Sequence, residues 1–229
     1  MSDRSIVGKN ILVTGAFGGI GAALVDVLLK NGASHIYAAS RTPGGSTNPR
    51  VIPTALDITS TVETERLARS IHVDILINNA GVNTNTSILA NGDVDWARHE
   101  MDVNYFGLLN MCRAFAPQMT ARGAGLIVNI LSSASLSPVP RMGSYCASKA
   151  AAWSLTQCLS AEIKPYGVDV IAIFPGATDT RLTAHLTSPK LTPLQVAEGT
   201  VMAVLEGMFE HKMKIGVTHP IDKSSEPNA

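Results

Sequence analysis

The sequence predicts a doubly wound α/β domain, in which helices cover both faces of a parallel sheet of about seven strands. Three observations lead to this fold class. Short apolar runs alternate with segments of helical spacing along the chain. The runs are apolar at consecutive positions, which is typical of strands covered on both faces. No linker-like stretch or internal repeat divides the 229 residues, so we expect a single domain over residues 1–229.

Four strands and one helix are expected before residue 80. The strands are predicted at residues 10–14, 35–40, 51–56 and 75–78. The helix is predicted over Gly19–Lys30, because apolar residues recur there at helical spacing and Asn31-Gly32 is a usual helix end. Residues 42–50 are rich in Gly, Pro and Ser and show no helical pattern, so we expect a loop there.

The rest of the chain continues the alternation. A long helical segment is expected over residues 93–122, with a break near Gly107 and an end at Gly123. Later strands are predicted at residues 126–131, 168–174 and 214–218, and later helices at residues 143–164 and 194–209. Gly167 closes the first of these helices, and residues 222–229 form a polar tail.

Composition excludes several classes of protein. The formal net charge is zero, which gives no sign of a nucleic-acid or anionic-membrane partner. No apolar run approaches the roughly 20 residues of a membrane span, and the N-terminus lacks the apolar core of a signal peptide. The three cysteines have no CxxC spacing and indicate reduced thiols, while the six histidines show no metal-binding spacing. We therefore expect a cytoplasmic protein without a metal site.

A glycine-rich turn follows the first predicted strand. Gly15, Gly19 and Gly21 stand in the order strand, turn and helix that phosphate binding requires. Glycines let backbone N–H groups approach a pyrophosphate, and the start of a helix favours its negative charge. The spacing is not GxGxxG, and such a turn could also join a strand to a helix without binding anything. Its position favours a dinucleotide site.

The residues that end the second strand indicate which dinucleotide binds. NAD-binding proteins place an acid about 20 residues after the glycines, whereas this chain has Ser40-Arg41. An arginine can bind a phosphate through two parallel N–H groups. We therefore expect NADP(H) to be preferred, with NAD(H) possible. Arg41 could also be a solvated surface residue, and Arg50 could reach the phosphate in its place.

Tyr145 and Lys149 stand four residues apart at the start of an Ala-rich helical segment, so they share one helix face. Ser132 lies thirteen residues before Tyr145, just after an apolar strand. An ammonium group near a phenol favours the phenolate and lowers the phenol pKa from about 10. The three side chains therefore predict an acid/base site in which a tyrosine exchanges a proton.

As a set, these motifs resemble the classical short-chain dehydrogenase/reductases, over about residues 9–180. The motifs that carry the resemblance are the glycine turn, Asn78-Asn79-Ala80-Gly81, Ser132 and Tyr145-x3-Lys149. The resemblance implies a Rossmann fold and an NADP-preferring carbonyl reductase that transfers hydride between the nicotinamide and a ketone or secondary alcohol. Tyr145 would be the general acid/base, Lys149 would tune it and bind the ribose, and Ser132 would stabilise the carbonyl oxygen.

The resemblance also assigns residues around these three. The family spacing selects Ser132 over Ser133 and Ser135. Asn104 would hold a water that passes protons from Lys149 to solvent, or would be only a helix-kink residue. The residues expected at the cofactor are Gly15, Phe17, Gly18, Gly19, Ile20, Gly21, Ser40, Arg41, Asp57, Ile58, Asn79, Ala80, Gly81, Tyr145, Lys149, Pro175, Gly176, Thr178 and Thr180. Residues 1–124 would form the cofactor half, and residues 125–220 the catalytic and substrate half.

The segments expected to meet the substrate are mostly apolar and carry no cluster of Arg or Lys. They are residues 82–89, 134–142 and 179–192, the last of which is a short version of the family's substrate lid. They favour a small neutral carbonyl or alcohol substrate. Two other functions stay open: a non-catalytic NADP(H)-sensing regulatory protein, and a reductase of carrier-bound 3-oxoacyl chains.

The low content of charged residues, 16%, favours a surface that is partly buried against other subunits. The family forms its subunit interfaces on the helices that correspond to residues 93–122 and 143–164. We therefore expect a homodimer or homotetramer.

Overall fold

Seven parallel strands form one sheet in the order β3-β2-β1-β4-β5-β6-β7 in the computed structural model, which describes residues 4–214. The strands are β1 (Asn10–Thr14), β2 (His35–Ser40), β3 (Val51–Ala55), β4 (Ile75–Asn78), β5 (Gly125–Ile130), β6 (Val168–Pro175) and β7 (Glu210–Met213). The strand order reverses between β1 and β4, and ligands bind at the carboxyl ends of strands beside such a reversal. The predicted doubly wound fold is confirmed.

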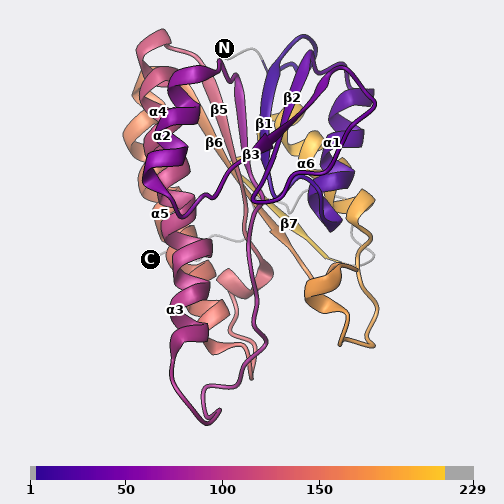
Figure 1. Ribbon diagram of the computed structural model, residues 1–229, viewed down its shortest axis with the longest axis vertical. Helices are drawn as coiled ribbons and strands as arrows, with labels where there is room; N and C mark the ends of the chain where they lie inside the picture. Colours follow the sequence, from indigo (N-terminus) through magenta and orange to yellow (C-terminus); the bar gives the residue numbers. More distant parts are fainter. Residues whose placement is uncertain (1–3, 215–229) are drawn as a thin grey trace, which may run out of the picture.

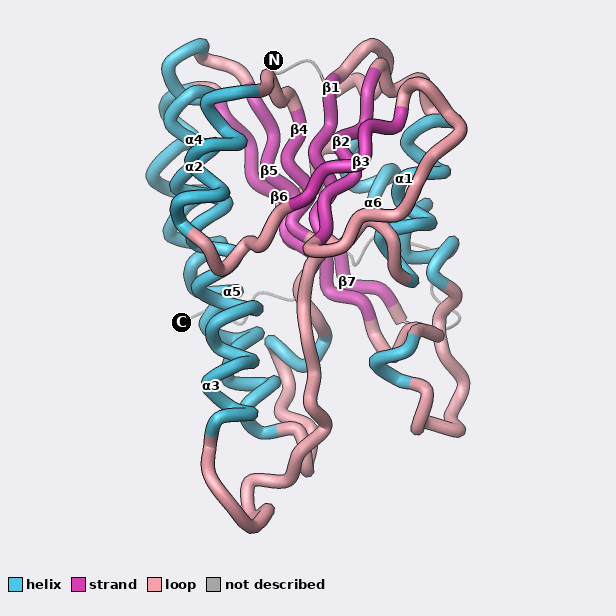
Figure 2. Tube along the Cα trace, viewed as in Figure 1, coloured by secondary structure: helices cyan, strands magenta, loops and turns pink. Residues whose placement is uncertain are grey.

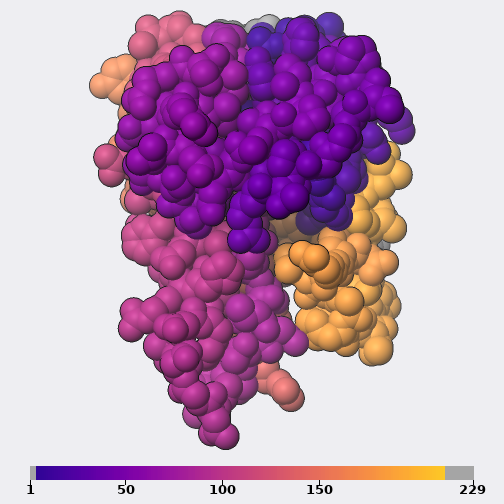
Figure 3. Space-filling model, in the orientation of Figure 1, coloured from indigo at the N-terminus to yellow at the C-terminus, as the bar shows by residue number. Residues whose placement is uncertain are grey.

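Helices cover both faces of the sheet (Figures 1 and 2). Helices α1 (Gly19–Lys30) and α6 (Pro193–Glu206) lie on one face, and α2 (Thr61–Ser70), α4 (Leu108–Arg122) and α5 (Gly143–Ile163) on the other. Short helix α3 (Asp95–Met101) extends the second layer beyond the sheet. This extension forms one wall of a cleft, and the orange segment that contains residues 179–192 forms the opposite wall (Figure 3).

The first strand shows why its residues are apolar at consecutive positions. Ile11 and Val13 pack into one core together with Leu24 of α1. Leu12, between them, packs into the other core with Phe115 of α4. Because successive side chains of a strand point to opposite faces, a strand between two helix layers must be apolar throughout.

The break predicted near Gly107 is a turn of π-helix. It spans Asp102–Gly107 and joins α3 to α4 without ending the helical path. Gly123 ends α4 in the left-handed region, with a φ of 70°, as the sequence predicted. One extra residue in a helical turn changes which side chains face the sheet, and Asn104 lies within this turn.

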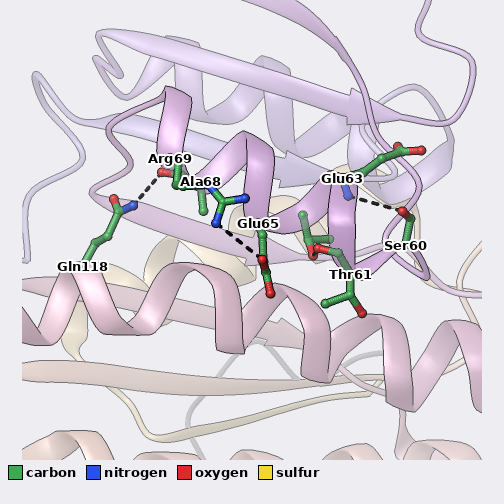
Figure 4. Close-up of polar contacts among 8 residues, drawn as sticks. Ser60, Thr61, Glu63, Glu65, Ala68, Arg69 and Gln118 are labelled. Carbon is green, nitrogen blue, oxygen red and sulfur yellow. Dashed lines mark hydrogen bonds and ion pairs between the residues drawn. The ribbon is translucent and has the colours of Figure 1, made fainter.

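Helix α2 has no counterpart in the sequence-based prediction. Ser60 caps it by accepting a hydrogen bond of 3.3 Å from the Glu63 backbone N–H, and Gln118 of α4 donates a bond of 2.6 Å to the carbonyl of Ala68 (Figure 4). Only Thr64 and Ala68 of this helix are buried, so its apolar periodicity is weak. The cap pattern of a serine followed three residues later by a glutamate was the available signal.

The elements near the C-terminus lie earlier than predicted. Helix α6 ends at Glu206, not at residue 209, because Gly207 adopts a left-handed φ of 68°. The seventh strand begins earlier than predicted and covers Glu210–Met213; only alternate residues of this strand are buried, so it carries no apolar run. Residues 215–218 of the predicted strand and the predicted polar tail at residues 222–229 lie outside the described residues.

Two other expectations concern loops and membranes. Residues 42–50 form no helix, as predicted. Within residues 4–214, none of the helices combines the length and apolar character that a membrane span requires.

Candidate active site

Most of the predicted site residues lie at the carboxyl ends of the central strands and at the start of α5. This is the edge at which the cleft of Figure 3 opens. A cavity of about 500 Å³ lies at the opposite edge, where Lys9 and Asp74 immediately precede β1 and β4, and none of the predicted site residues lines it. The predicted active site and this cavity therefore lie at opposite edges of the sheet.

The glycine turn is tight and is held from the neighbouring strand. Gly15 has a φ of 65°, and a Cβ on Gly21 would stand 2.0 Å from the carbonyl oxygen of Gly15. Asn79, after β4, donates from Nδ2 to the carbonyls of Thr14 (2.9 Å) and Gly15 (3.2 Å). Phe17, with the two glycines after it, is exposed at the start of α1. Exposed backbone N–H groups at a helix start fit a pyrophosphate.

Replacement of Gly21 by alanine is expected to lower the free energy of unfolding by about 1–3 kcal/mol, because the added methyl group overlaps the Gly15 carbonyl. Urea denaturation of the purified variant measures this change. Gly18→Ala is the matched control, since a Cβ on Gly18 meets no atom within 4 Å. Equal midpoints for the two variants would contradict the close contact.

The end of β2 fits a phosphorylated ribose. The Ser40 hydroxyl is buried and has no hydrogen-bond partner among the described residues, while Arg41 beside it is exposed. Asp57, after β3, accepts hydrogen bonds from the Thr59 hydroxyl (2.7 Å) and backbone N–H (2.9 Å), which lower its pKa, and the charge of Arg41 lowers it further. The unpaired hydroxyl and the arginine leave donors for an anionic group.

The alternative that Arg50 reaches this phosphate is wrong. Arg50 precedes β3 and therefore lies at the amino edge of the parallel sheet, whereas Arg41 follows β2 at the carboxyl edge. Its guanidinium donates a hydrogen bond of 3.1 Å to the carbonyl of Ala33. The strand direction separates the two arginines, and Arg41 alone of the pair is near the cofactor edge.

Ser132, Tyr145 and Lys149 come together at the carboxyl end of β5. The Ser132 side chain lies near enough to the Tyr145 phenol to lower its pKa, and its Oγ accepts a hydrogen bond of 3.1 Å from the Ala134 backbone N–H. The Lys149 ammonium lies 5.9 Å from the centre of the Tyr145 ring and donates to the carbonyl of Ile130 (3.4 Å). The serine chosen by spacing is thus the one beside the phenol.

Burial controls the protonation of this pair. Burial raises the pKa of Tyr145; the hydrogen bond with Ser132 opposes this shift, and the charges of Cys146 and Glu100 add to it. Burial also lowers the pKa of Lys149 from 10.5 to about 8. The expectation that Lys149 lowers the Tyr145 pKa is therefore wrong for the net shift, because burial of the phenol dominates. Tyr145 keeps its proton near pH 7, as a proton donor must.

Asn104 uses both ends of its amide to hold neighbouring segments. Its Oδ1 accepts from the Val82 backbone N–H (2.9 Å), and its Nδ2 donates to the Val82 carbonyl (2.8 Å) and the Ser148 hydroxyl (2.9 Å). Ser148 in turn donates to the carbonyl of Tyr145 (2.8 Å). A small cavity of about 10 Å³ borders Asn104 and Lys149, close to the volume that one water needs.

The segment after β6 lies against the glycine turn. Thr180 lies so close to Gly19 that a Cβ there would stand 2.7 Å from the threonine methyl group. Thr178 is buried and donates to the carbonyl of Gly176 (3.0 Å), which follows Pro175 at the end of β6. The predicted residues of this segment therefore face the cofactor edge.

The other predicted cofactor residues lie around the small cavity beside Asn104 or pack near α1. Ile58, Ala80, Asn104 and Lys149 line the small cavity, and Gly81 lies against Asn104 and Lys149. Phe17 packs against Gly44, whereas Ile20 packs against the core under α1.

Sequence reasoning missed one buried charge beside the site. Glu100 is 1% exposed and hydrogen-bonds Thr84 and Ser144. The one feature of the sequence that could have indicated its role is its position four residues before Asn104, on the same face of the helix.

Comparison with known proteins agrees with this geometry. Residues 9–191 match the short chain dehydrogenase family. The crystal structure of a short chain dehydrogenase from Burkholderia cenocepacia J2315 in complex with NADP is 39% identical, with a TM-score of 0.88 over 92% of this chain and 90% of that one.

Curated relatives give the same family. The 3-ketodihydrosphingosine reductase of Bacteroides thetaiotaomicron is 31% identical over 80% of this chain and 68% of that protein. An uncharacterized oxidoreductase of Staphylococcus saprophyticus is 31% identical over 86% of this chain and 91% of that protein. The chain therefore belongs to the short-chain dehydrogenase family, whose members are oxidoreductases that act on CH–OH or C=O groups with a nicotinamide cofactor.

Proposed function

We propose that the protein is an NADP(H)-dependent reductase of neutral, apolar ketones, with Tyr145 as the general acid/base. The observation that carries the proposal is the Tyr145 phenol beside Ser132, with the buried Lys149 ammonium 5.9 Å from the centre of its ring. The unpaired hydroxyl of Ser40 beside Arg41 supports NADP(H), as does the NADP bound in the Burkholderia relative.

Each side chain has a separate task in the proposed reaction. The bound cofactor supplies the hydride in reduction and takes it in oxidation. Ser132 donates a hydrogen bond to the carbonyl oxygen and stabilises the negative charge that develops there. Tyr145 gives its proton to that oxygen, and Lys149 stabilises the phenolate that remains. Asn104 then holds a water from which a proton returns through Lys149, and the cavity beside these two residues supports this path.

Apolar side chains around the cleft favour the proposed substrate class. The exposed large apolar residues of the three substrate segments are Ile88, Leu89, Leu136, Val139 and Leu182. Such side chains lower their free energy by contact with an apolar substrate. The name of the Bacteroides relative, 3-ketodihydrosphingosine reductase, is consistent with a ketone as substrate.

A panel of ketones tests the proposed function. The purified protein is expected to oxidise NADPH with neutral ketones, and kcat/KM is expected to rise with the apolar size of the ketone. Ketones that carry a carboxylate serve as the matched comparison. NADPH binding without turnover of any ketone or aldehyde would favour the NADP(H)-sensing alternative. Turnover only of carrier-bound 3-oxoacyl chains would favour the second alternative.

Arg41→Ala is expected to raise the Kd for NADPH by about 10- to 100-fold, because a charged hydrogen-bond donor to the 2′-phosphate is lost. The Kd for NADH, which lacks this phosphate, is expected to stay unchanged. Fluorescence titration with each cofactor measures both constants. Arg50→Ala is the matched control, since that guanidinium binds Ala33 at the other edge. An equal loss of affinity for both cofactors would contradict the role of Arg41.

A further inference from the structure

Glu100 joins the loop after β4 to the first turn of α5. Its Oε1 accepts hydrogen bonds from the Thr84 backbone N–H (2.6 Å) and from the Thr84 hydroxyl (2.8 Å). Its Oε2 accepts a hydrogen bond from the hydroxyl of Ser144, the residue immediately before Tyr145. One buried side chain thus contacts both a substrate segment and the helix that carries the acid/base.

The same arrangement occurs one helical turn further along. Asn104, four residues after Glu100, binds both polar backbone atoms of Val82 and the hydroxyl of Ser148. Val82 lies two residues before, and Ser148 four residues after, the residues that Glu100 binds. Two successive turns therefore hold the same loop against the same helix, and Tyr145 lies between their two contacts on α5.

The two contacts differ in charge. Glu100 is only 1% exposed, and burying a carboxylate costs free energy unless hydrogen bonds replace its hydration. All three of its contacts are with groups that can donate a hydrogen bond, so they replace the lost hydration of the side chain. A neutral amide makes the equivalent contacts at Asn104 without that cost. A neutral side chain could hold the loop against α5 equally well, so this structural role does not explain why residue 100 is an acid.

We propose that Glu100 is a positioning residue for the reaction, which fixes the first turn of α5, and with it Tyr145, against the substrate segment at residues 82–89. The proposal rests on the proposed role of Tyr145 as acid/base. Within the same segment, Ile88 lies against Gly143 at the start of α5, which is a further contact between the segment and the helix. The negative charge of Glu100 also favours the protonated phenol over the phenolate.

Glu100→Gln separates the charge from the shape, because glutamine keeps the length of the side chain and an acceptor for Thr84. The groups that face the Tyr145 phenol are Ser132, Cys146, Lys149 and Glu100. Loss of the negative charge favours the phenolate of Tyr145. The decline of ketone reduction on the alkaline side is therefore expected to begin at lower pH in this variant. Asp102→Asn, an exposed charge on the following turn, is the matched control with an unchanged profile.

Two further variants separate the two sides of Glu100. Ser144→Ala removes the contact with α5 and is expected to lower kcat about three- to tenfold with little change in KM. Thr84→Val removes one contact with the substrate segment and is expected to raise KM by a similar factor with little change in kcat. If Glu100→Gln does not fold, as judged by circular dichroism, the kcat and KM of Ser144→Ala and Thr84→Val test the proposal on their own.

The outcomes of these experiments are distinguishable. A parental pH profile in Glu100→Gln, together with parental kcat and KM in Ser144→Ala and Thr84→Val, would overturn the role of Glu100. If Tyr145→Phe retained parental activity, the proposed function itself would fail, whatever the Glu100 variant did.

Discussion

Tyr145→Phe is expected to lower kcat for ketone reduction by about 100- to 10,000-fold, because the variant has no proton to give to the carbonyl oxygen. The phenyl ring keeps its packing, so the Kd for NADPH and the thermal midpoint are expected to change little. Steady-state NADPH oxidation with the best ketone of the panel measures the loss. The burial that raises the Tyr145 pKa keeps the proton in place near pH 7, so the loss is expected across the neutral range.

Tyr166→Phe is the matched control for this change. Tyr166 is 59% exposed and follows the end of α5, far along the helix from Tyr145. Its variant is expected to keep parental kcat. Equal activity of the parent and Tyr145→Phe with every accepted ketone would contradict the proposed mechanism.

Lys149→Met is expected to lose most activity and yet to be more stable than the parent. Burial lowers the Lys149 pKa from 10.5 to about 8, so at pH 7 the folded protein holds an ammonium at a site that disfavours it. Each unit of pKa shift corresponds to about 1.4 kcal/mol, and methionine of similar length removes this cost. We expect the free energy of unfolding to rise by about 1–3 kcal/mol at pH 7.

The pH dependence of this gain has a defined sign. Between about pH 8 and 10.5 the unfolded parent binds more protons than the folded parent, so the parent's stability rises with pH in this window. The advantage of Lys149→Met is therefore expected to be full below pH 8 and to shrink above it. Urea denaturation across this range measures it, with the exposed Lys30→Met as control. A variant less stable than the parent at pH 7 would contradict a net burial cost at Lys149.

The catalytic edge of the fold could be predicted because its signals are local. The Asn31-Gly32 end of α1, the apolar β1 and the spacing of Ser132 and Tyr145 each depend on few neighbours in the chain. Helix α2 could not be found from its apolar pattern, since only Thr64 and Ala68 are buried and a side chain from α4 holds it.

Other features depend on the three-dimensional arrangement of the chain. The positions of Arg41 and Arg50 at opposite edges follow from the direction of two paired strands, which their proximity in the sequence conceals. The burial of Glu100 depends on two segments that pack around it from either side. The net pKa shift of Tyr145 likewise depends on how deeply the fold buries the phenol, which its spacing from Lys149 does not reveal.

The most direct test of the central claim follows one hydrogen from cofactor to product. The protein is incubated with a neutral ketone and NADPH that carries deuterium at the transferable position of the nicotinamide, and the alcohol is analysed by mass spectrometry. Direct hydride transfer with proton donation from Tyr145 predicts an alcohol with deuterium on the former carbonyl carbon, formed by the parent and nearly absent with Tyr145→Phe. Labelled alcohol formed equally fast by both proteins, or none formed by the parent from any ketone, would contradict the claim.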